Sequence, residues 1–101
     1  MFQNLTDEVD LLHRHLVVYN QVLAHEPIGI VAIAKKTGLS EYQVRYSLSV
    51  LEEYTLITPT QNGAITTQEA AELFEEYHAK VENVSERLHQ LLMTELTSPI
   101  E

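Results

Sequence analysis

The chain has 101 residues, of which 45% are hydrophobic, so its length suits one domain with a modest core. It contains no cysteine, which excludes disulfides, thiolate metal sites and cysteine nucleophiles. The N-terminal residues lack the charged-then-apolar order of a signal peptide, and no apolar run approaches the ~18 residues of a membrane span. We therefore expect a soluble, cytoplasmic protein with no membrane partner.

The formal net charge is −9, and it is distributed unevenly along the chain. Residues 1–26 sum to −3 and residues 67–101 to −6, whereas the charges of residues 27–66 cancel. A DNA-binding domain usually carries a basic face, so the total charge disfavours nucleic acid, but a neutral middle segment still allows a local basic surface. An acidic balance with few lysines also fits a host with a salty cytoplasm.

The first predicted element is a helix over residues 6–25. Thr6 is its expected N-cap, because a hydroxyl oxygen accepts hydrogen bonds from the free N–H groups of a first helical turn. Pro27 ends the helix. The apolar residues recur at steps of three and four, which places them on one helical stripe: Leu5, Val9, Leu12, Leu16, Tyr19 and Leu23.

Two further helices are predicted in the middle of the chain. The first begins at Ile30, carries two lysines in its last turn and stops at Gly38, which can adopt the left-handed conformation of a helix end. The second runs from Ser40 to about Tyr54. Ser40 and Gln43 have the spacing of a capping box, in which each side chain bonds the backbone N–H of the other. The buried stripe of the second helix is Val44, Leu48 and Leu51.

A β-hairpin is predicted after the second of these helices. Leu56–Thr58 and Ala64–Thr66 have the composition of strands, and the segment between them begins with Pro59. Asn62-Gly63 is a strong hairpin signal, because both residues tolerate a positive φ. An isolated two-stranded hairpin is only marginally stable, so we expect it to pack against the helices.

The last predicted element is a long helix over residues 67–96, where Thr66 and Glu69 repeat the capping-box spacing. Its apolar residues alternate steps of four and three, as in a coiled coil. This stripe packs either on the first helix or on a second copy of the chain, and we favour a homodimer built from the last helix with help from the first. The predicted dimer interface is Phe74, Tyr77, Val81, Val84, Leu88 and Leu91.

The region from residue 30 to residue 66 resembles the winged helix-turn-helix of small archaeal and bacterial transcription regulators. The residues that carry the resemblance are Ile33-Ala34, Lys36, Thr37-Gly38-Leu39-Ser40, Val44, Leu48, Leu51-Glu52, Leu56-Ile57 and Asn62-Gly63. The resemblance implies that residues 1–101 form a single, mainly α domain with a small β-hairpin. Within it, residues 6–25 form the N-terminal helix, residues 27–66 the winged helix-turn-helix core and residues 67–96 a coiled-coil-like dimerisation helix.

One position departs from the pattern of these regulators. The residue before Leu56-Ile57 is usually glycine in them, whereas this chain has Thr55. A β-branched residue disfavours the left-handed conformation, so we expect the preceding helix to end differently.

The resemblance further implies a sequence-specific DNA-binding regulator that acts as a homodimer on a palindromic site in double-stranded DNA. The major groove admits one α-helix, whose outward residues meet the base edges. Gln43 is expected to pair with adenine, and Arg45 with guanine or a phosphate. The predicted DNA-binding residues are Lys35, Lys36, Ser40, Tyr42, Gln43, Arg45, Tyr46, Ser49, Gln61 and Asn62.

Several of these residues also have a purely structural interpretation. Arg45 can form an ion pair with Glu41 or Glu52 instead of entering a groove. At least one of Tyr42 and Tyr46 can pack against the hairpin or the first helix. Lys35 and Lys36 can simply be solvent-exposed residues at the end of their own helix.

The whole domain has an alternative function, a winged-helix protein–protein interaction module that does not bind DNA. The net charge of −9 favours this hypothesis, and so does the presence of a single arginine, Arg45, on the helix from Ser40 to Tyr54. We expect no enzymatic activity, no catalytic residues and no cofactor, because three glycines form no phosphate-binding loop. We also expect no metal site, because the five histidines lack the spacing of a helical zinc site.

Overall fold

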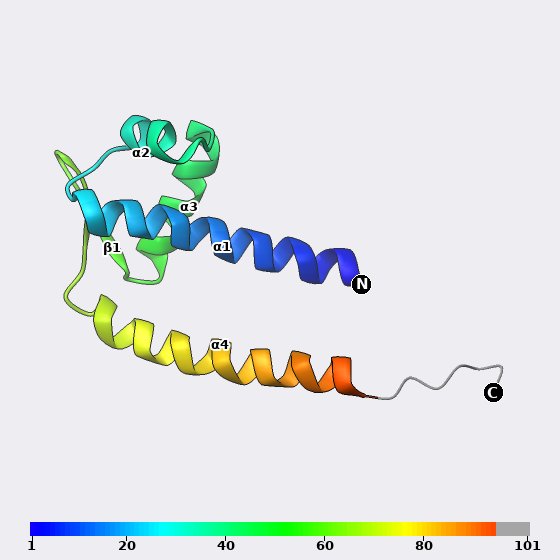
Figure 1. The fold of residues 1–101 in the computed structure, drawn as a ribbon. Helices are drawn as coiled ribbons and strands as arrows, with labels where there is room; N and C mark the ends of the chain where they lie inside the picture. The colour runs from blue at the N-terminus through cyan, green and yellow to red at the C-terminus, as the bar shows by residue number, and fades with distance from the viewer. Residues whose placement is uncertain (95–101) are drawn as a thin grey trace. The chain divides into compact units, whose positions relative to one another are not determined.

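The computed structural model describes residues 1–94 of the chain. Its elements, in chain order, are α1 (Phe2–His25), α2 (Ile30–Thr37), α3 (Glu41–Glu53), β1 (Ile57–Thr60), β2 (Gly63–Thr66) and α4 (Ala70–Met93) (Figure 1). The predicted mainly α fold with a small hairpin is therefore confirmed. The contacts divide the chain into two compact units, Met1–Ala70 and the residues from Ala71 onward, and each is described by itself. The single domain stays a prediction.

Helix α1 begins at Phe2, four residues before the predicted start, so the prediction of Thr6 as N-cap is wrong. The hydroxyl of Thr6 donates to the carbonyl of Phe2, one turn back, at 3.2 Å. A threonine hydroxyl that donates to the carbonyl four residues earlier belongs to the interior of a helix, because the accepting residue is itself helical. The predicted end is confirmed, since the last helical residue is His25 and Pro27 follows two residues later.

Helices α2 and α3 are joined by the turn that the sequence predicts. Gly38 has φ 79°, and its N–H donates to the carbonyl of Ala34 at 2.9 Å. The capping box at the start of α3 is also confirmed. Ser40 Oγ accepts from the backbone N–H of Gln43, and Gln43 Oε1 accepts from the backbone N–H of Ser40, both at 3.1 Å.

Helix α3 ends in a left-handed turn at Thr55, which has φ 65°. The N–H of Thr55 donates to the carbonyl of Glu52 at 3.0 Å, and the N–H of Leu56 donates to the carbonyl of Leu51 at 2.9 Å. These two bonds define a Schellman motif, which glycine usually closes. The expectation that the helix ends differently is therefore wrong. The hydroxyl of Thr67, which donates to the carbonyl of Thr55 at 2.7 Å, helps to hold this strained residue in place.

The hairpin pairs β1 with β2 in antiparallel register, from Ile57 opposite Thr66 to Thr60 opposite Gly63. The loop therefore consists of Gln61 and Asn62, and β1 starts one residue later than predicted and extends to Thr60. Gly63 has a positive φ, whereas Asn62 does not. The hydroxyl of Thr60 closes the loop, because it donates to the carbonyl of Gly63 at 2.6 Å and accepts from the N–H of Asn62.

The segment after α1 pairs with β2 and ties the hairpin to the helices. The N–H of Ile28 donates to the carbonyl of Ala64 at 3.2 Å, and the N–H of Ala64 donates to the carbonyl of Ile28 at 2.8 Å. The carboxylate of Glu26 accepts from both the backbone N–H and the hydroxyl of Thr66, at 2.8 and 2.9 Å. The backbone of Ile28 passes so close that a Cβ on Gly63 would lie 2.6–2.7 Å from it.

Helix α4 begins at Ala70, three residues after the predicted start. The prediction of Thr66 as its N-cap is wrong, because Thr66 lies at the end of β2 and its hydroxyl is bonded to Glu26. The described part of α4 ends at Met93. The predicted end at Leu96 lies outside the described residues.

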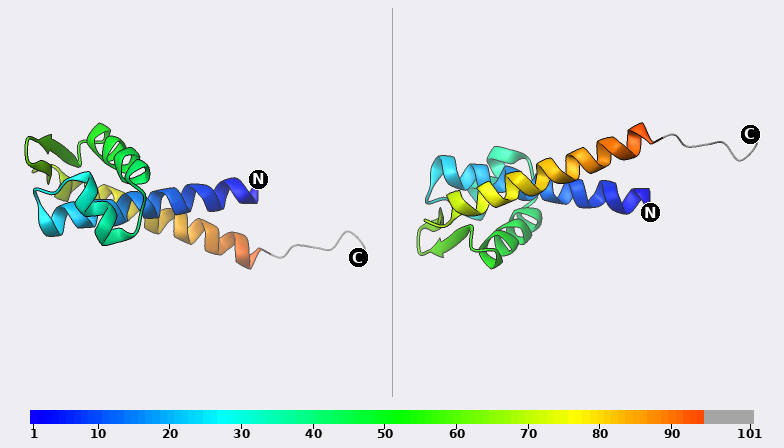
Figure 2. Two further views of the ribbon diagram at one scale, coloured as in Figure 1. Left: turned by 90° about the horizontal axis from the view of Figure 1, so that it is seen from above. Right: turned by 90° about the horizontal axis from the view of Figure 1, so that it is seen from below.

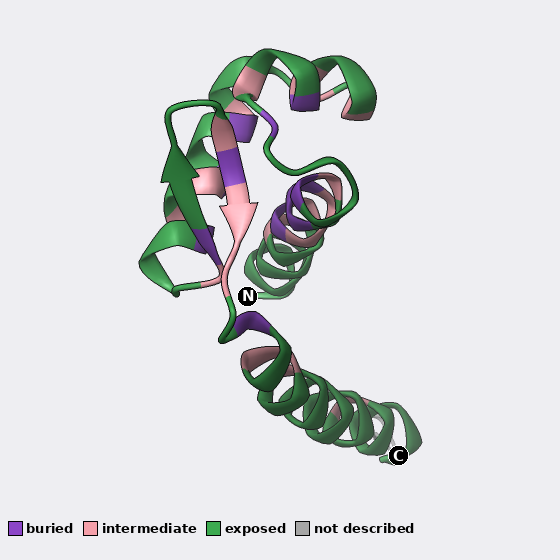
Figure 3. Ribbon diagram, turned by 90° about the vertical axis from the view of Figure 1, so that its left-hand side faces the viewer, coloured by how far each residue is buried: buried purple, intermediate pink, exposed green. Residues whose placement is uncertain are grey.

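The core of the first unit lies where the second half of α1 meets α2, α3 and the hairpin. The views from above and below show these elements gathered at one end of α1 (Figure 2). The buried positions cluster there, whereas the first half of α1 is exposed (Figure 3). The buried apolar residues are Val18, Tyr19, Val22, Ile28, Ile33, Val44, Leu51, Ile57, Ala64 and Ala70.

Replacing Thr55 by glycine is expected to stabilise the protein by about 1 kcal/mol, because glycine adopts the left-handed conformation without the penalty of a Cβ. The side chain of Thr55 is exposed, so no packing is lost. Urea unfolding followed by circular dichroism measures the change. Thr55→Ala is the matched control, because it keeps the Cβ and should gain much less. A loss of stability in Thr55→Gly would contradict the strain at this position.

Replacing Gly63 by alanine is expected to destabilise the protein by about 3 kcal/mol, because the new Cβ overlaps the backbone of Ile28 and the φ of 129° is strained for any L-residue. Gly29→Ala is the control, since a Cβ at this position would meet no heavy atom within 4 Å and the φ of Gly29 is negative. Its cost should stay under about 1 kcal/mol. Equal losses in the two variants, measured by thermal unfolding, would rule out the close approach as the cause.

Candidate nucleic-acid interface

Helix α3 has one buried and one exposed face. Val44, Ser47 and Leu51 are buried and pack against α1, α2 and β1. The spacing of 3.6 residues per turn places four of the predicted contact residues together on the opposite face. All four are exposed, and they are Tyr42, Arg45, Tyr46 and Ser49. The structure therefore brings the middle of the predicted site together on one surface, the outward face of α3.

Two predicted contact residues at the start of α3 are already engaged with each other. Ser40 and Gln43 form the capping box, and the side chain of Gln43 is half-buried. The amide oxygen of Gln43 accepts from the N–H of Ser40. A bidentate contact from Gln43 to adenine needs both its oxygen and its nitrogen. Such a contact would engage the same oxygen that caps α3, so the capping role of Gln43 competes with its predicted role in base recognition.

The guanidinium of Arg45 is available on the outward face of α3. Within residues 1–94 it makes no ion pair with Glu41 or Glu52, the two acids that the sequence offers as partners. Arg45 is therefore the exposed cation of α3. Tyr42, one turn earlier, has 79% of its surface exposed. The two side chains project from the same face, where a planar cation and an aromatic ring suit contacts with bases, phosphates or a protein surface.

Tyr46 is the tyrosine that packs against the first helix. Its ring centroid lies 5.8 Å from that of His15 in α1, at an interplanar angle of 45°. The Nδ1 atom of His15 lies 2.8 Å from Oγ of Ser47, on the buried face of α3. His15 is 8% exposed and Ser47 is fully buried. Burial lowers the pKa of His15, and the neighbouring charge of Arg14 lowers it further.

Sequence reasoning considered the histidines only as metal ligands and missed this contact. A signal was present, because His15 lies three residues after Leu12 and four before Tyr19, on the apolar stripe of its helix. A polar residue on such a stripe is expected to be buried and hydrogen-bonded. The partner, Ser47, lies 32 residues away, and only the fold brings the two together.

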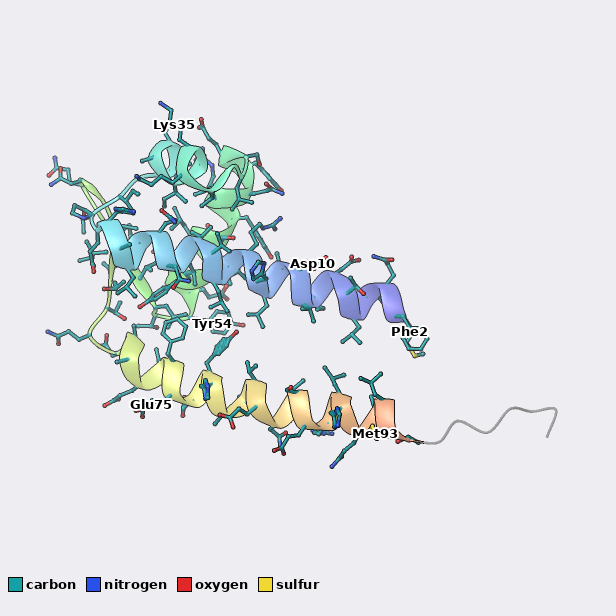
Figure 4. All side chains as sticks on the ribbon, viewed as in Figure 1. Phe2, Asp10, Lys35, Tyr54, Glu75 and Met93 are labelled. Atoms are coloured by element: carbon teal, nitrogen blue, oxygen red, sulfur yellow. The ribbon has the colours of Figure 1, made fainter. Side chains whose placement is uncertain are left out.

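Charged side chains of both signs surround α3, and Glu41 lies exposed in its first turn. Lys35 and Lys36 lie exposed in the last turn of α2, and the side chain of Lys35 extends away from the helices (Figure 4). Glu52 and Glu53 lie exposed at the other end of α3. Across residues 1–70 the sequence carries eight acidic residues and four lysines or arginines. Lys35, Lys36 and Arg45 thus lie near the start of α3 together with one acidic residue. The predicted contact residues of the hairpin, Gln61 and Asn62, are exposed at its tip.

The apolar stripe of α4 is exposed along much of its length (Figure 3). Phe74 and Tyr77 contact each other, with ring centroids 5.8 Å apart, and both are half-buried. Leu88 is half-buried as well. The other predicted interface residues are exposed, namely Val81, Val84 and Leu91. A surface helix that exposes a regular apolar stripe has a face suited to another protein surface.

The first turns of α1 expose a second apolar stripe. Phe2, Leu5, Val9 and Leu12 are all exposed, and Phe2 lies at the free end of the helix (Figure 4). None of the helices within residues 1–94 is long and apolar enough to cross a membrane. In the same residues, no three histidine or acidic side chains lie close enough together to hold a metal ion.

Two helices joined by a glycine turn and followed by a two-stranded hairpin define a winged helix-like fold. In this class the second helix of the pair is the recognition helix, and α3, with its exposed outward face, occupies that position. The chain belongs to the FaeA-like protein family, whose family model matches residues 14–71. This match spans the second half of α1, both following helices and the hairpin. The first half of α1 and nearly all of α4 lie outside it.

A solved structure supports the same fold. The activation domain of the phage T4 transcription factor MotA is similar with a TM-score of 0.55 and 19% sequence identity. The alignment covers 77% of this chain and 81% of that domain. At this identity the similarity shows the fold alone. No curated protein matches the sequence.

Proposed function

We propose that this protein is a transcription regulator that binds specific sites in double-stranded DNA as a homodimer. The observation that carries the proposal is the outward face of α3, where Tyr42, Arg45 and Ser49 are exposed on a helix whose opposite face is buried. The family assignment and the MotA fold, which belongs to a transcription factor, support a role in transcription. The first half of α3 would lie in the major groove.

Each part of this surface has a role in the proposal. Arg45 reads a guanine edge or holds a phosphate, and Tyr42 and Ser49 contact the neighbouring backbone. Lys35 and Lys36 bind phosphates, together with the free N–H groups at the start of α3. The hairpin tip, residues 61–62, reaches the adjoining groove or backbone. These few positive charges predict weak binding by one subunit, because phosphate contacts supply most non-specific affinity.

The proposed dimer compensates for this weak binding. Pairing the α4 stripes of two chains buries Val81, Val84 and Leu91, which are exposed in one chain. The exposed apolar residues at the start of α1 offer further surface to the same dimer. Two linked recognition helices gain affinity through a high effective concentration. A palindromic site with half-sites about 34 Å apart, or a multiple of this distance, follows from such a symmetric dimer.

Arg45→Ala is expected to weaken binding to a DNA site selected from random sequence by about tenfold and to relax its specificity, because a bidentate arginine contact discriminates by ~1–3 kcal/mol. Lys35→Ala should weaken binding to every sequence evenly and reduce the salt slope by about one. Fluorescence polarisation over a range of salt concentrations measures both effects. Lys80→Ala, which removes the same charge from α4, is the control and should change little. Absence of binding to any duplex at low salt would exclude the proposal.

Val84→Glu is expected to dissociate the homodimer, because it places a charge in the middle of the paired apolar stripes. The dimer dissociation constant should rise at least about tenfold, which corresponds to about 1.4 kcal/mol. Sedimentation equilibrium of the wild type and the variant tests this. Asn83→Glu is the matched control, since it adds the same charge one residue away, off the stripe. A wild-type protein that stays monomeric at high concentration would refute the dimer.

A second candidate function is a protein-interaction module that does not bind DNA. The observation that favours it is the composition of the outward face of α3, where two exposed tyrosines stand beside one arginine and Glu53 lies on the same side. Tyrosine is enriched in protein interfaces. Tyr42→Ala distinguishes the two functions. If DNA binding is absent and this variant loses a stable protein partner of the wild type, the second function is the correct one.

A further inference from the structure

The side chain of His15, on α1, contacts two residues of α3. Its Nδ1 atom lies 2.8 Å from Oγ of Ser47, which is fully buried on the inner face of α3. Its ring also packs against Tyr46, which stands on the outward face. A single imidazole therefore links the buried face of the recognition helix to its exposed face.

The surroundings of His15 favour a neutral ring. On its own helix Arg14 directly precedes it, and Tyr19 lies one turn later on the same stripe. On α3, Tyr46 is in contact with the ring and Arg45 is exposed. Neither strand carries a titratable residue, and α2 carries only the exposed lysines. The remaining titratable residues of α1 and α3 are exposed, namely Asp7, Glu8, Asp10, His13 and His25 on α1 and Glu41, Tyr42, Glu52 and Glu53 on α3. Within residues 1–94 no carboxylate forms an ion pair with His15.

We propose that His15 is a proton-sensitive positioning residue, which holds the outward face of α3 in its binding conformation while its ring is neutral and releases that face when the ring is protonated. The proposal rests on the proposed function, because it concerns the surface that we assign to DNA. It adds to that function a dependence of binding on pH that originates outside the contact surface.

A protonated imidazole carries a charge that is unfavourable in a buried site beside Arg14. Relief of this charge requires the ring to move toward solvent, and the ring is held between Ser47 and Tyr46. Movement of the ring therefore displaces Tyr46, which belongs to the outward face of α3.

The sign of the pH dependence follows from the lowered pKa of His15, which burial causes first and Arg14 second. Between the pKa of the folded state and the unfolded value of 6.5, the unfolded chain binds more protons than the folded one. The contribution of the neutral ring is therefore complete above pH 6.5 and is lost as the pH falls through the pKa of the folded state.

The test compares His15→Asn with His13→Asn. In His15→Asn the new side-chain amide takes the place of the Nδ1 edge of the ring and can still reach Ser47, but it does not titrate. His13 is exposed on the same helix, so its replacement is the matched control. Affinity for a labelled duplex selected from random sequence is measured at about pH 7.5 and about pH 5. We expect the wild type and His13→Asn to lose at least about threefold in affinity at the lower pH relative to His15→Asn.

A second measurement needs neither a variant nor DNA. In the wild-type protein, NMR follows the ring resonances of His15 and Tyr46 during a pH titration. We expect both to shift together, with a midpoint below 6.5. A Tyr46 ring that does not respond to the titration of His15 overturns the proposal, and so does equal pH dependence of binding in the two asparagine variants. If no DNA is bound at any pH, the proposed function fails by itself, and the NMR titration still decides the role of His15.

Discussion

The packing of α3 against the second half of α1 is the contact on which the rest of the structure depends. The Nδ1 atom of His15 on α1 lies 2.8 Å from Oγ of Ser47 on the inner face of α3, and Val18, Val22, Val44 and Ser47 of these two helices have no exposed surface. This contact decides which side of α3 faces outward. The turn at Gly38 and the capping box at the start of α3 set where the helix begins.

The small core explains both the exposed surfaces and the proposed assembly. The core occupies one end of α1, so the stripe at its other end has no cover within the first unit. The stripe of α4 is also largely exposed. Both stripes lie mostly outside the region that matches the FaeA-like family. In the proposed function, the part of the chain that matches the family recognises DNA. The apolar stripes of α1 and α4 serve a separate role, the assembly of the dimer.

Local signals predict the elements well, but they fail where a residue has two compatible uses. Thr66 has the spacing of an N-cap and the composition of a strand, and its bonds to Glu26 decide for the strand. Thr55 disfavours a left-handed turn, yet the Schellman bonds and the hydroxyl of Thr67 hold it there. The sequence allows Gln43 both a cap and a base contact, and the structure shows its oxygen in the cap.

The sequence by itself determined the order of helices and strands, the turn at Gly38 and the capping box of α3, because these depend on residues at most four positions apart. It also predicted the exposed face of α3 from helical periodicity. Only the tertiary structure decided the need for glycine at position 63, where the backbone of Ile28 passes, and the burial of His15 against Ser47. These contacts join residues more than thirty positions apart, and their geometry depends on how the helices and the hairpin pack.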